Sequence, residues 1–336
     1  MTRVAINGFG RIGRNFVRAS LERETSYEVV AINDLGDPKT MAHLLEFDSL
    51  LGRLPDEVEV DADSATIAVG GHRLQAFSIP EPEKLPWREL GVDVVVESTG
   101  RFAKREQAQA HLDAGAPTVV ITAVADDADV MLVLGVNDDA YDPKRHRVIS
   151  NGSCTTNCVT PLAKVLHDAF GIERGLMTTV HAYTASQPVL DSPHKDLRRA
   201  RAAAINPIPT STSATRALGT VLPELDGKIG ALAIRAPVPV GSIVDLVVEV
   251  SRPTNRDEVN AVFRSTAEQG PLAGILRYAD EPLVSSDIVR SPYSCIFDSQ
   301  LTMVDERLMK VFGWYDNEWG YSCRLVDLVN LVGTER

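Results

Sequence analysis

The chain has 336 residues, enough for two ordinary domains, and 44% of them are hydrophobic, as in a folded globular protein. The chain has 34 Lys and Arg residues and 46 Asp and Glu residues, so its formal net charge is -12. This charge weighs against a nucleic-acid or anionic-membrane partner, because such binders carry a basic surplus. With only four cysteines, no signal-peptide pattern and no long apolar run, we expect a reducing, cytoplasmic location and no membrane span.

The first 34 residues predict a dinucleotide-binding unit. Residues 3–7 are typical of a strand, residues 14–22 of a helix, and residues 28–33 of a second buried strand that Asp34 follows. The turn after the first strand reads Gly8-Phe9-Gly10-Arg11-Ile12-Gly13. Glycines allow a tight turn close to a pyrophosphate, and the helix N-terminus offers N–H groups to the anion. Asp34 can accept from a ribose 2′-hydroxyl and would repel a 2′-phosphate, which favours NAD over NADP.

The α/β alternation continues beyond this unit. Strands are expected over residues 92–98, 118–122, 131–134 and 147–149, and a helix over residues 104–114. The first of these strands ends in Ser98-Thr99-Gly100, at the place where doubly wound sheets bind ligands. The pattern predicts one nucleotide-binding domain up to about residue 151.

A cysteine segment opens the second half of the chain. Ser153 is a natural N-cap for the amphipathic stretch that follows, which places Cys154 in the first helical turn. The helix dipole there is expected to lower the thiol pKa and to favour a reactive thiolate. Cys158, one turn further on, is interpreted as a buried small hydrophobe. No metal site is expected, since C-x3-C lacks a second ligand pair and the seven histidines are scattered.

Several motifs together carry a family resemblance. They are Ala5-Ile6-Asn7-Gly8-Phe9-Gly10-Arg11-Ile12-Gly13-Arg14, Glu97-Ser98-Thr99-Gly100, Ser153-Cys154-Thr155-Thr156-Asn157-Cys158, Thr179-Val180-His181-Ala182-Tyr183-Thr184, Leu197-Arg198-Arg199-Ala200-Arg201 and Trp314-Tyr315-Asp316-Asn317-Glu318. Over nearly its whole length, the sequence resembles phosphorylating glyceraldehyde-3-phosphate dehydrogenase.

The resemblance implies covalent catalysis. Cys154 would be the nucleophile and would form a thiohemiacetal with the aldehyde. Hydride transfer to NAD would then leave a thioester, which inorganic phosphate cleaves to an acyl phosphate. His181 matches the general base. The product of D-glyceraldehyde 3-phosphate would be 1,3-bisphosphoglycerate.

The resemblance also implies binding residues. The positions that match cofactor contacts are Gly8, Phe9, Gly10, Arg11, Ile12, Gly13, Asp34, Ser98, Thr99, Gly100, Thr122, Asn317 and Tyr321. Two anion sites, for the sugar phosphate and for inorganic phosphate, would use Ser153, Thr155, Thr184, Arg198, Arg199, Thr212, Ser213 and Arg235. The sequence leaves open which of Arg198 and Arg199 faces the pocket.

The expected architecture has two domains. Residues 1–151 with 316–336 would form a Rossmann-type, doubly wound NAD-binding domain, completed by a C-terminal helix over about 318–332. Residues 152–315 would form an α+β catalytic domain with a mainly antiparallel sheet, whose strands include 229–235, 244–251 and 309–315. The resemblance further implies a homotetramer.

Several positions depart from the usual family pattern. They include Gly152, Ser186, Pro207, Ser213, Cys295 and Cys323. The changes around the Cys154 pocket motivate a second hypothesis, an isoform that confers self-resistance to a Cys-directed epoxide inhibitor. A further alternative is erythrose-4-phosphate dehydrogenase, which oxidises a longer sugar phosphate without phosphorolysis. A binding protein that lost catalysis, or a dehydrogenase without covalent catalysis, is disfavoured by the intact Cys154, His181 and Arg235.

Overall fold

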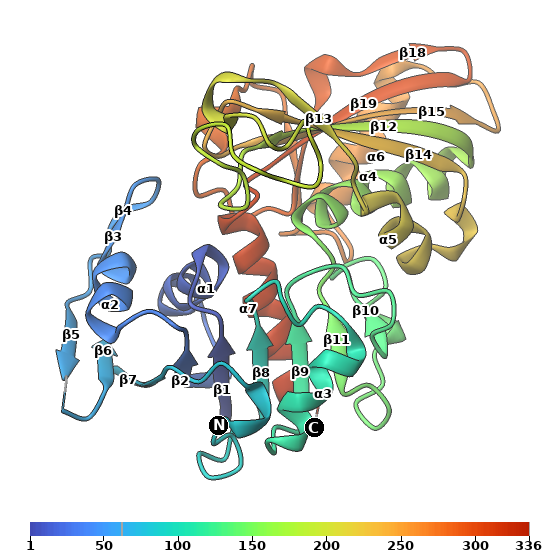
Figure 1. Ribbon diagram of the computed structural model, residues 1–336. Coiled ribbons are helices and arrows are strands. Elements are labelled where there is room, and N and C mark those ends of the chain that lie inside the picture. The colour runs from blue at the N-terminus through green and yellow to red at the C-terminus, as the bar shows by residue number, and fades with distance from the viewer. Residues whose placement is uncertain (62, 336) are drawn as a thin grey trace. The chain divides into compact units, whose positions relative to one another are not determined.

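The computed structural model describes residues 1–61 and 63–335 (Figure 1). The chain divides into two compact units, and each is described by itself. The first comprises Met1–Leu132, Asp139–Gly152 and Ser322–Arg336, and the second comprises Val133–Asp138 and Ser153–Tyr321.

The first unit is built on a mostly parallel sheet. Its strands lie in the order β10-β11-β9-β8-β1-β2-β7-β6-β5, and only β6 and β5 run antiparallel to their neighbours. Their bounds are β1 Thr2–Asn7, β2 Tyr27–Asn33, β5 Val58–Asp61, β6 Thr66–Val69, β7 His72–Phe77, β8 Val94–Glu97, β9 Thr118–Ile121, β10 Val130–Met131 and β11 Val148–Ser150. Because β2 lies on one side of β1 and β8 on the other, the order reverses between β1 and β8. This is the topological switch point of a doubly wound fold.

The helices of the first unit cover this sheet. They are α1 Arg11–Glu22, α2 Pro38–Glu46, α3 Arg105–Asp113 and the larger part of α7 Trp319–Thr334, and a small hairpin pairs β3 Phe47–Asp48 with β4 Gly52–Arg53. Parallel strands are buried on both faces, which explains the continuous β-branched run in β8. Trp87, fully buried, packs with Val95 and Val119 in the core under α3.

The second unit holds a mainly antiparallel sheet. Its strands lie in the order β13-β14-β12-β15-β19-β17-β16, with β18 paired to β19. Their bounds are β12 Ile172–Ala182, β13 Ile208–Thr210, β14 Ile229–Ala236, β15 Ser242–Val250, β16 Leu276–Ala279, β17 Cys295–Asp298, β18 Met303–Asp305 and β19 Leu308–Tyr315. Two pairs are parallel, β12 with β14 and β16 with β17.

Three helices pack on one face of this sheet, as Figure 1 shows: α4 Cys154–Phe170, α5 Ala214–Val221 and α6 Arg256–Glu268. The period-2 burial of β15, buried on alternate residues, places Val244, Leu246 and Val248 toward the core. The fold class predicted from the sequence is therefore confirmed in both of its parts.

The boundaries of the units differ from the predicted ones in two segments and at Gly152, which belongs to the first unit. Residues 133–138 and 316–321 belong to the second unit. The first segment packs closely there, since a Cβ on Gly135 would lie 2.7 Å from Pro271 O and 2.9 Å from a Leu272 methyl. The second is tied by Asn317, whose amide oxygen accepts from Ser242 Oγ at 3.0 Å.

Candidate active site

A cavity of about 280 Å³ opens in the first unit at the carboxyl ends of β1 and β8. It lies at the switch point, where doubly wound sheets bind nucleotides. Its lining residues are Asn7, Gly8, Gly10, Asn33, Asp34, Leu35, Ile79, Pro80, Ser98, Thr99, Arg101 and Phe102. The structure thus brings five predicted cofactor residues to one cavity: Gly8, Gly10, Asp34, Ser98 and Thr99.

The glycine turn forms the floor of this cavity. Gly8 has φ +94°, and a Cβ there would lie 2.6 Å from Thr99 N, so only glycine fits. Gly10 is the N-cap of α1 and has no side-chain cap, and a Cβ on it would meet nothing within 4 Å. The space beside the N-terminus of α1 is therefore open at Gly10, and a helix N-terminus of this kind fits a pyrophosphate. Arg11 instead forms an ion pair with the buried Asp48 carboxylate.

Asp34 is fixed by backbone donors at the end of β2. One carboxylate oxygen accepts from Phe9 N at 2.7 Å, and the other accepts from Gly36 N at 3.0 Å. These bonds tie the acidic side chain to the glycine turn. A carboxylate held at this place suits the ribose 2′-hydroxyl that the sequence predicted for it.

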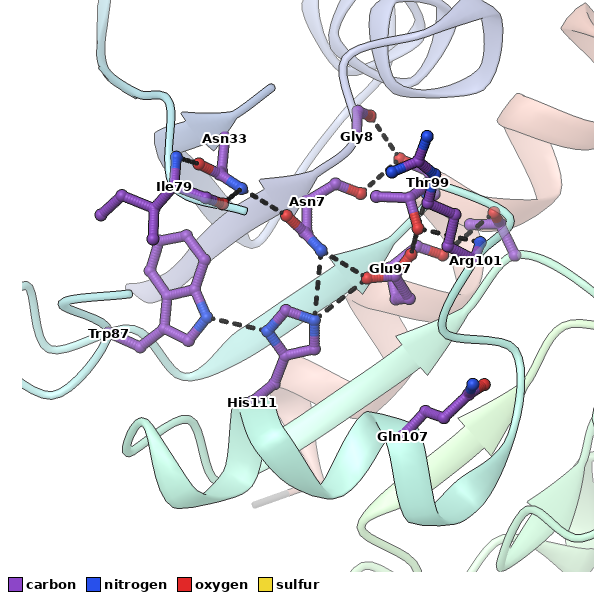
Figure 2. Close-up of polar contacts among 12 residues, drawn as sticks. Asn7, Gly8, Asn33, Ile79, Trp87, Glu97, Thr99, Arg101, Gln107 and His111 are labelled. Carbon is purple, nitrogen blue, oxygen red and sulfur yellow. Dashed lines mark hydrogen bonds and ion pairs between the residues drawn. The ribbon is translucent and has the colours of Figure 1, made fainter. Parts of the chain in front are cut away.

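A buried polar network lies behind the cavity (Figure 2). Asn33 Nδ2 donates to Asn7 Oδ1 at 2.7 Å, and Asn7 Nδ2 donates to Glu97 Oε2 at 2.6 Å. His111 Nε2 lies 3.0 Å from the same Glu97 oxygen. Trp87 Nε1 donates to His111 Nδ1 at 3.1 Å. Since an indole N–H can only donate, His111 carries its proton on Nε2 and donates it to Glu97.

This network joins two walls of the cavity. At one end, Asn33 exchanges hydrogen bonds with both backbone groups of Ile79, at 2.9 Å each. At the other, Glu97 Oε1 accepts from Thr99 N at 2.8 Å. Every linking side chain is at least nine-tenths buried, so the spacing of the walls depends on these bonds.

In the second unit, Cys154 is the first residue of α4. Ser153 is the N-cap, and its Oγ accepts from Thr156 N at 3.0 Å, as the sequence predicted. Gly152 has φ +61°, a left-handed conformation that lets the chain turn sharply from β11 into the helix. Cys158 is fully buried, which also agrees with its interpretation as a core residue.

Strand pairing places the basic partners of Cys154. His181 on β12 and Arg235 on β14 are directly paired across two parallel strands, so their side chains lie next to each other. His181 Nε2 lies 3.3 Å from Cys154 Sγ. Arg235 Nη1 lies 2.6 Å from His181 Nδ1. The two predicted catalytic residues are thus in contact.

Burial dominates the protonation of this pair. It raises the pKa of the Cys154 thiol to about 11, although the Arg235 charge and the Thr155 N–H act in the opposite direction. The predicted lowering of this pKa by the helix N-terminus is therefore wrong, because desolvation outweighs the backbone N–H groups. Burial and then the Arg235 charge lower the pKa of His181 to about 3. The resting pair is therefore a thiol beside a neutral imidazole.

The other nitrogen of His181 has two competing neighbours. Nδ1 lies 2.6 Å from Ala182 O, which can only accept, and 2.6 Å from Arg235 Nη1, which can only donate. Arg235 Nη1 also lies 3.3 Å from Ala182 O. The imidazole can satisfy one neighbour at a time, so any ligand that draws the guanidinium away favours a proton on Nδ1 and a free lone pair on Nε2.

Tyr315 on β19 packs against His181 of the Cys154–His181 pair. Its ring lies edge-on to His181, with ring centroids 5.9 Å apart. Its hydroxyl lies 2.9 Å from Thr155 Oγ1 and 2.8 Å from Thr179 Oγ1. Thr155, predicted to bind phosphate, therefore has its hydroxyl occupied by Tyr315. The sequence analysis quoted Tyr315 in a motif but assigned it no role.

A cluster of polar groups surrounds Arg235. Arg199 Nη2 donates to Ser186 Oγ at 3.2 Å, and Ser186 Oγ lies 3.0 Å from Thr184 Oγ1. The Arg199 charge lowers the pKa of Arg235, after the larger effect of burial, so the two guanidinium groups are close. Arg198 is exposed. Arg199, rather than the exposed Arg198, therefore lies beside Ser186 and Thr184 in this cluster.

This cluster has donors that no protein group uses. The Nε atoms of Arg199 and Arg235 and the Nε2 of Gln187 are buried without a hydrogen-bond partner. Two adjacent cations with unused N–H groups repel each other unless an anion lies between them. The arrangement fits a phosphate group.

The remaining predicted residues lie in three places. Thr212 and Ser213 precede α5, where Thr212 Oγ1 accepts from Ala214 N at 3.2 Å. Ser213 has φ -90°, a conformation open to any residue, so no strain results from its side chain. Thr122 donates its hydroxyl to Glu97 O at 3.1 Å in the first unit. Asn317 and Tyr321 are buried in the second unit.

Sequence reasoning missed several residues of the cavity, among them Asn7, Asn33, Ile79, Arg101 and Phe102. Asn7 and Asn33 each close a buried strand of apolar residues, and an amide at that position is a usable signal. Ile79 follows β7, a strand that the sequence did not indicate.

The glycine-turn cavity and the thiol–imidazole pair fit the class of nucleotide-dependent oxidoreductases. Models of two families match the chain: "Glyceraldehyde 3-phosphate dehydrogenase, NAD binding domain" at residues 2–105, and "Glyceraldehyde 3-phosphate dehydrogenase, C-terminal domain" at residues 153–317. The chain belongs to the glyceraldehyde-3-phosphate dehydrogenase family, and its cofactor is NAD.

Curated relatives match over nearly their full length. The chain is 59% identical over 334 residues to glyceraldehyde-3-phosphate dehydrogenase 2 of Streptomyces avermitilis, covering 99% of each chain. It is 58% identical over 334 residues to the enzyme of Streptomyces coelicolor, again covering 99% of each. The enzyme of Mycobacterium tuberculosis is 59% identical over 336 residues, covering 98% of each.

Across residues 1–61 and 63–335, no helix combines the length and apolar character needed to cross a bilayer. Over the same residues, no group of three or more His, Cys, Asp or Glu side chains is arranged to hold a metal ion.

Proposed function

We propose that this protein oxidises D-glyceraldehyde 3-phosphate to 1,3-bisphosphoglycerate, with NAD and inorganic phosphate as co-substrates. The observation that carries the proposal is the contact of Cys154 with His181 beside two half-buried arginines, Arg199 and Arg235, whose buried Nε atoms have no partner. A thiol and a base suit attack on an aldehyde, and the arginine pair suits a phosphorylated substrate.

The chemistry follows from the positions of the side chains. Cys154 Sγ adds to the aldehyde carbon while its proton passes through His181 Nε2 to the carbonyl oxygen, which gives a thiohemiacetal. His181 then removes the hydroxyl proton as the carbon loses its hydride, which leaves a thioester on Cys154. Bound NAD supplies the hydride acceptor. A phosphate oxygen attacks the thioester carbon, and Cys154 leaves and recovers its proton from His181.

Arg235 would have two tasks in this sequence. It would bind a substrate anion together with Arg199, Thr184 and the Ser186 hydroxyl. As the anion draws the guanidinium toward itself, His181 Nδ1 would be left to donate to Ala182 O, and Nε2 would then be ready to accept the Cys154 proton. Substrate binding and base activation would thereby be coupled.

NAD would be held by the first unit. The N-terminus of α1 behind Gly10 fits the pyrophosphate, and Asp34 fits the adenosine ribose. Thr122 and, from the second unit, Asn317 would act on the nicotinamide side. We propose residues 1–151 with 316–336 as the functional NAD-binding domain and residues 152–315 as the catalytic domain. A cytoplasmic homotetramer is the proposed state, which native mass measurement would test.

An assay of nicotinamide reduction tests the proposal. We expect turnover of D-glyceraldehyde 3-phosphate that needs both NAD and phosphate, with little activity with NADP, since Asp34 would repel a 2′-phosphate. Phosphate-independent turnover of erythrose 4-phosphate would instead identify the erythrose-4-phosphate dehydrogenase alternative. Absence of turnover with either aldehyde would overturn the proposal.

The epoxide-tolerant isoform stays a prediction. One altered position, Ser186, contacts both Thr184 and Arg199 in the anion cluster, and this observation favours a modified pocket. Incubation of the purified enzyme with a Cys-directed epoxide tests it. Inactivation as fast as that of a relative from Mycobacterium tuberculosis would contradict the prediction.

A further inference from the structure

Two buried thiols meet beneath the proposed nucleophile. Cys158 on α4 and Cys295 on β17 are both fully buried, and burial together with the neighbouring Cys295 thiol raises the pKa of Cys158 well above its usual value. Cys158 Sγ also lies 3.5 Å from Gly313 O on β19. All four cysteines of the chain are free thiols.

Gly313 provides the space for this thiol pair. A Cβ on Gly313 would lie 2.7 Å from Cys295 Sγ and 3.1 Å from Cys158 Sγ. Both sulfur atoms therefore point into the volume that a side chain at position 313 would fill. Two thiols that lie against one small shared space need only a short approach to form a disulfide.

The pair is connected to Cys154 through α4. Cys154 and Cys158 are four residues apart on this helix, so they lie on the same face. Cys154 is partly exposed, whereas Cys158 and Cys295 are not exposed at all. A peroxide in solution therefore reaches Cys154 first.

We propose that Cys158 and Cys295 are a resolving pair, which ends the peroxide oxidation of Cys154 in a buried Cys158–Cys295 disulfide and returns Cys154 as a thiol. The inference rests on the proposed role of Cys154 as an accessible nucleophile.

The steps balance with hydrogen peroxide as the oxidant. Cys154 Sγ attacks one peroxide oxygen, the O–O bond breaks, and a sulfenic acid and water result. Cys158 Sγ attacks Cys154 Sγ, the S–O bond breaks, and the leaving hydroxide takes the Cys158 proton as a second water. Cys295 Sγ then attacks Cys158 Sγ, and Cys154 leaves and takes up the Cys295 proton. Two thiols and one peroxide give one disulfide and two waters.

Helix geometry drives the last exchange. Side chains four apart on a helix have Cβ atoms about 5–6 Å apart, whereas a disulfide needs about 3.5–4.5 Å. A Cys154–Cys158 bond is therefore strained and easily cleaved, whereas a Cys158–Cys295 bond would join a helix to a strand and would not be bound to the fixed spacing of one helix. The exchange passes the oxidation from a strained bond to a relaxed one.

Peptide mapping of the full-length wild-type protein tests the proposal. The reduced protein is treated with one equivalent of hydrogen peroxide, alkylated with iodoacetamide and digested without reduction. We expect linked Cys158 and Cys295 peptides together with alkylated Cys154. A Cys154–Cys158 link as the end product, or over-oxidised Cys154 beside two free thiols, would overturn the proposal.

A matched pair of variants sharpens the test. In Cys295→Ser, we expect on the order of tenfold less alkylatable Cys154 after peroxide, because the resolving exchange is lost. Cys323→Ser, which removes a buried thiol of the first unit, should behave like wild type. If the amount of alkylatable Cys154 after peroxide is equal in Cys295→Ser and Cys323→Ser, the proposed resolving role of Cys158 and Cys295 is overturned. If Cys154 of the reduced protein resists alkylation, the proposed function fails together with the resolving pair. If Cys154 is readily alkylated but no Cys158–Cys295 disulfide forms, only the resolving pair is overturned.

Discussion

The polar groups buried at the two functional sites are arranged in opposite ways. In the first unit, Asn7, Asn33, Glu97 and His111 each find partners within one hydrogen-bonded network. In the second, His181 Nδ1 faces a donor and an acceptor at once, and buried guanidinium nitrogens lack partners. A satisfied network holds a shape, whereas an unsatisfied cluster is completed by a ligand. The cofactor cavity is therefore preformed, and the catalytic site is poised for an anion.

The largest effect should come from the nucleophile of the poised site. Cys154→Ser removes the thiol that forms both covalent intermediates, and we expect kcat to fall by at least about 10⁴-fold. Nicotinamide reduction measures the loss. Cys323→Ser, a thiol outside both sites, serves as the control and should keep its activity. Residual activity near wild type in Cys154→Ser would mean that catalysis does not pass through this thiol.

Arg235→Gln should remove the charge that opposes burial at Cys154. Arg235 lowers the pKa of the thiol, so its loss moves the alkylation profile to higher pH. At a fixed pH below the thiol pKa, iodoacetamide should react at least about tenfold more slowly, since a neighbouring opposite charge shifts a pKa by about one to three units. Arg198→Gln is the matched control with an unchanged profile. A shift of the Arg235→Gln alkylation profile to lower pH would contradict the conclusion that the Arg235 charge lowers the pKa of Cys154.

Arg199→Gln tests whether the unused donors await a phosphate. We expect the KM for the phosphorylated substrate, or for phosphate, to rise about 10- to 100-fold, because hydrogen bonds to charged groups contribute about 1.5–3 kcal/mol. Steady-state kinetics measure the change. The exposed neighbour in Arg198→Gln should leave both KM values unchanged. The reverse result, with Arg198 the sensitive position, would show that the anion cluster has been assigned to the wrong arginine.

The smallest effect is expected from the satisfied network. Trp87→Phe deprives His111 Nδ1 of its donor and should cost about 1–3 kcal/mol of unfolding free energy, because an acceptor is left buried and unsatisfied. The Kd for NAD should rise about 2- to 10-fold as the cavity walls loosen. Calorimetry and titration measure the two effects. Trp314→Phe, which removes an indole bond to Asp298 in the second unit, should lower stability without changing the Kd. If the Kd for NAD is equal in Trp87→Phe and Trp314→Phe, the buried network does not affect NAD binding.

Much of the first unit could be predicted from local sequence. The glycine turn, the strands β1, β2, β8 and β9 and the acid at Asp34 all follow from short segments, and so does the N-cap at Ser153 in the second unit. These features depend on neighbours in the chain, so periodicity and capping rules suffice.

The catalytic arrangement could not be predicted in this way. His181 and Arg235 are 54 residues apart, and only the parallel pairing of β12 with β14 brings them together. The choice between Arg198 and Arg199 depends on how one turn of the loop is rotated. The pKa of Cys154 depends on burial by distant strands, which is why a rule about helix ends alone gave the wrong direction.

The pairing of His181 with Arg235 also limits how this chain can change in length. Side chains alternate between the two faces of a strand, so one inserted residue in β12 or β14 before either position would turn its side chain to the opposite face. The pair would then be separated although neither residue had been substituted. Insertions and deletions in natural or engineered variants should therefore collect in the connecting loops, and the two strands should keep a constant length.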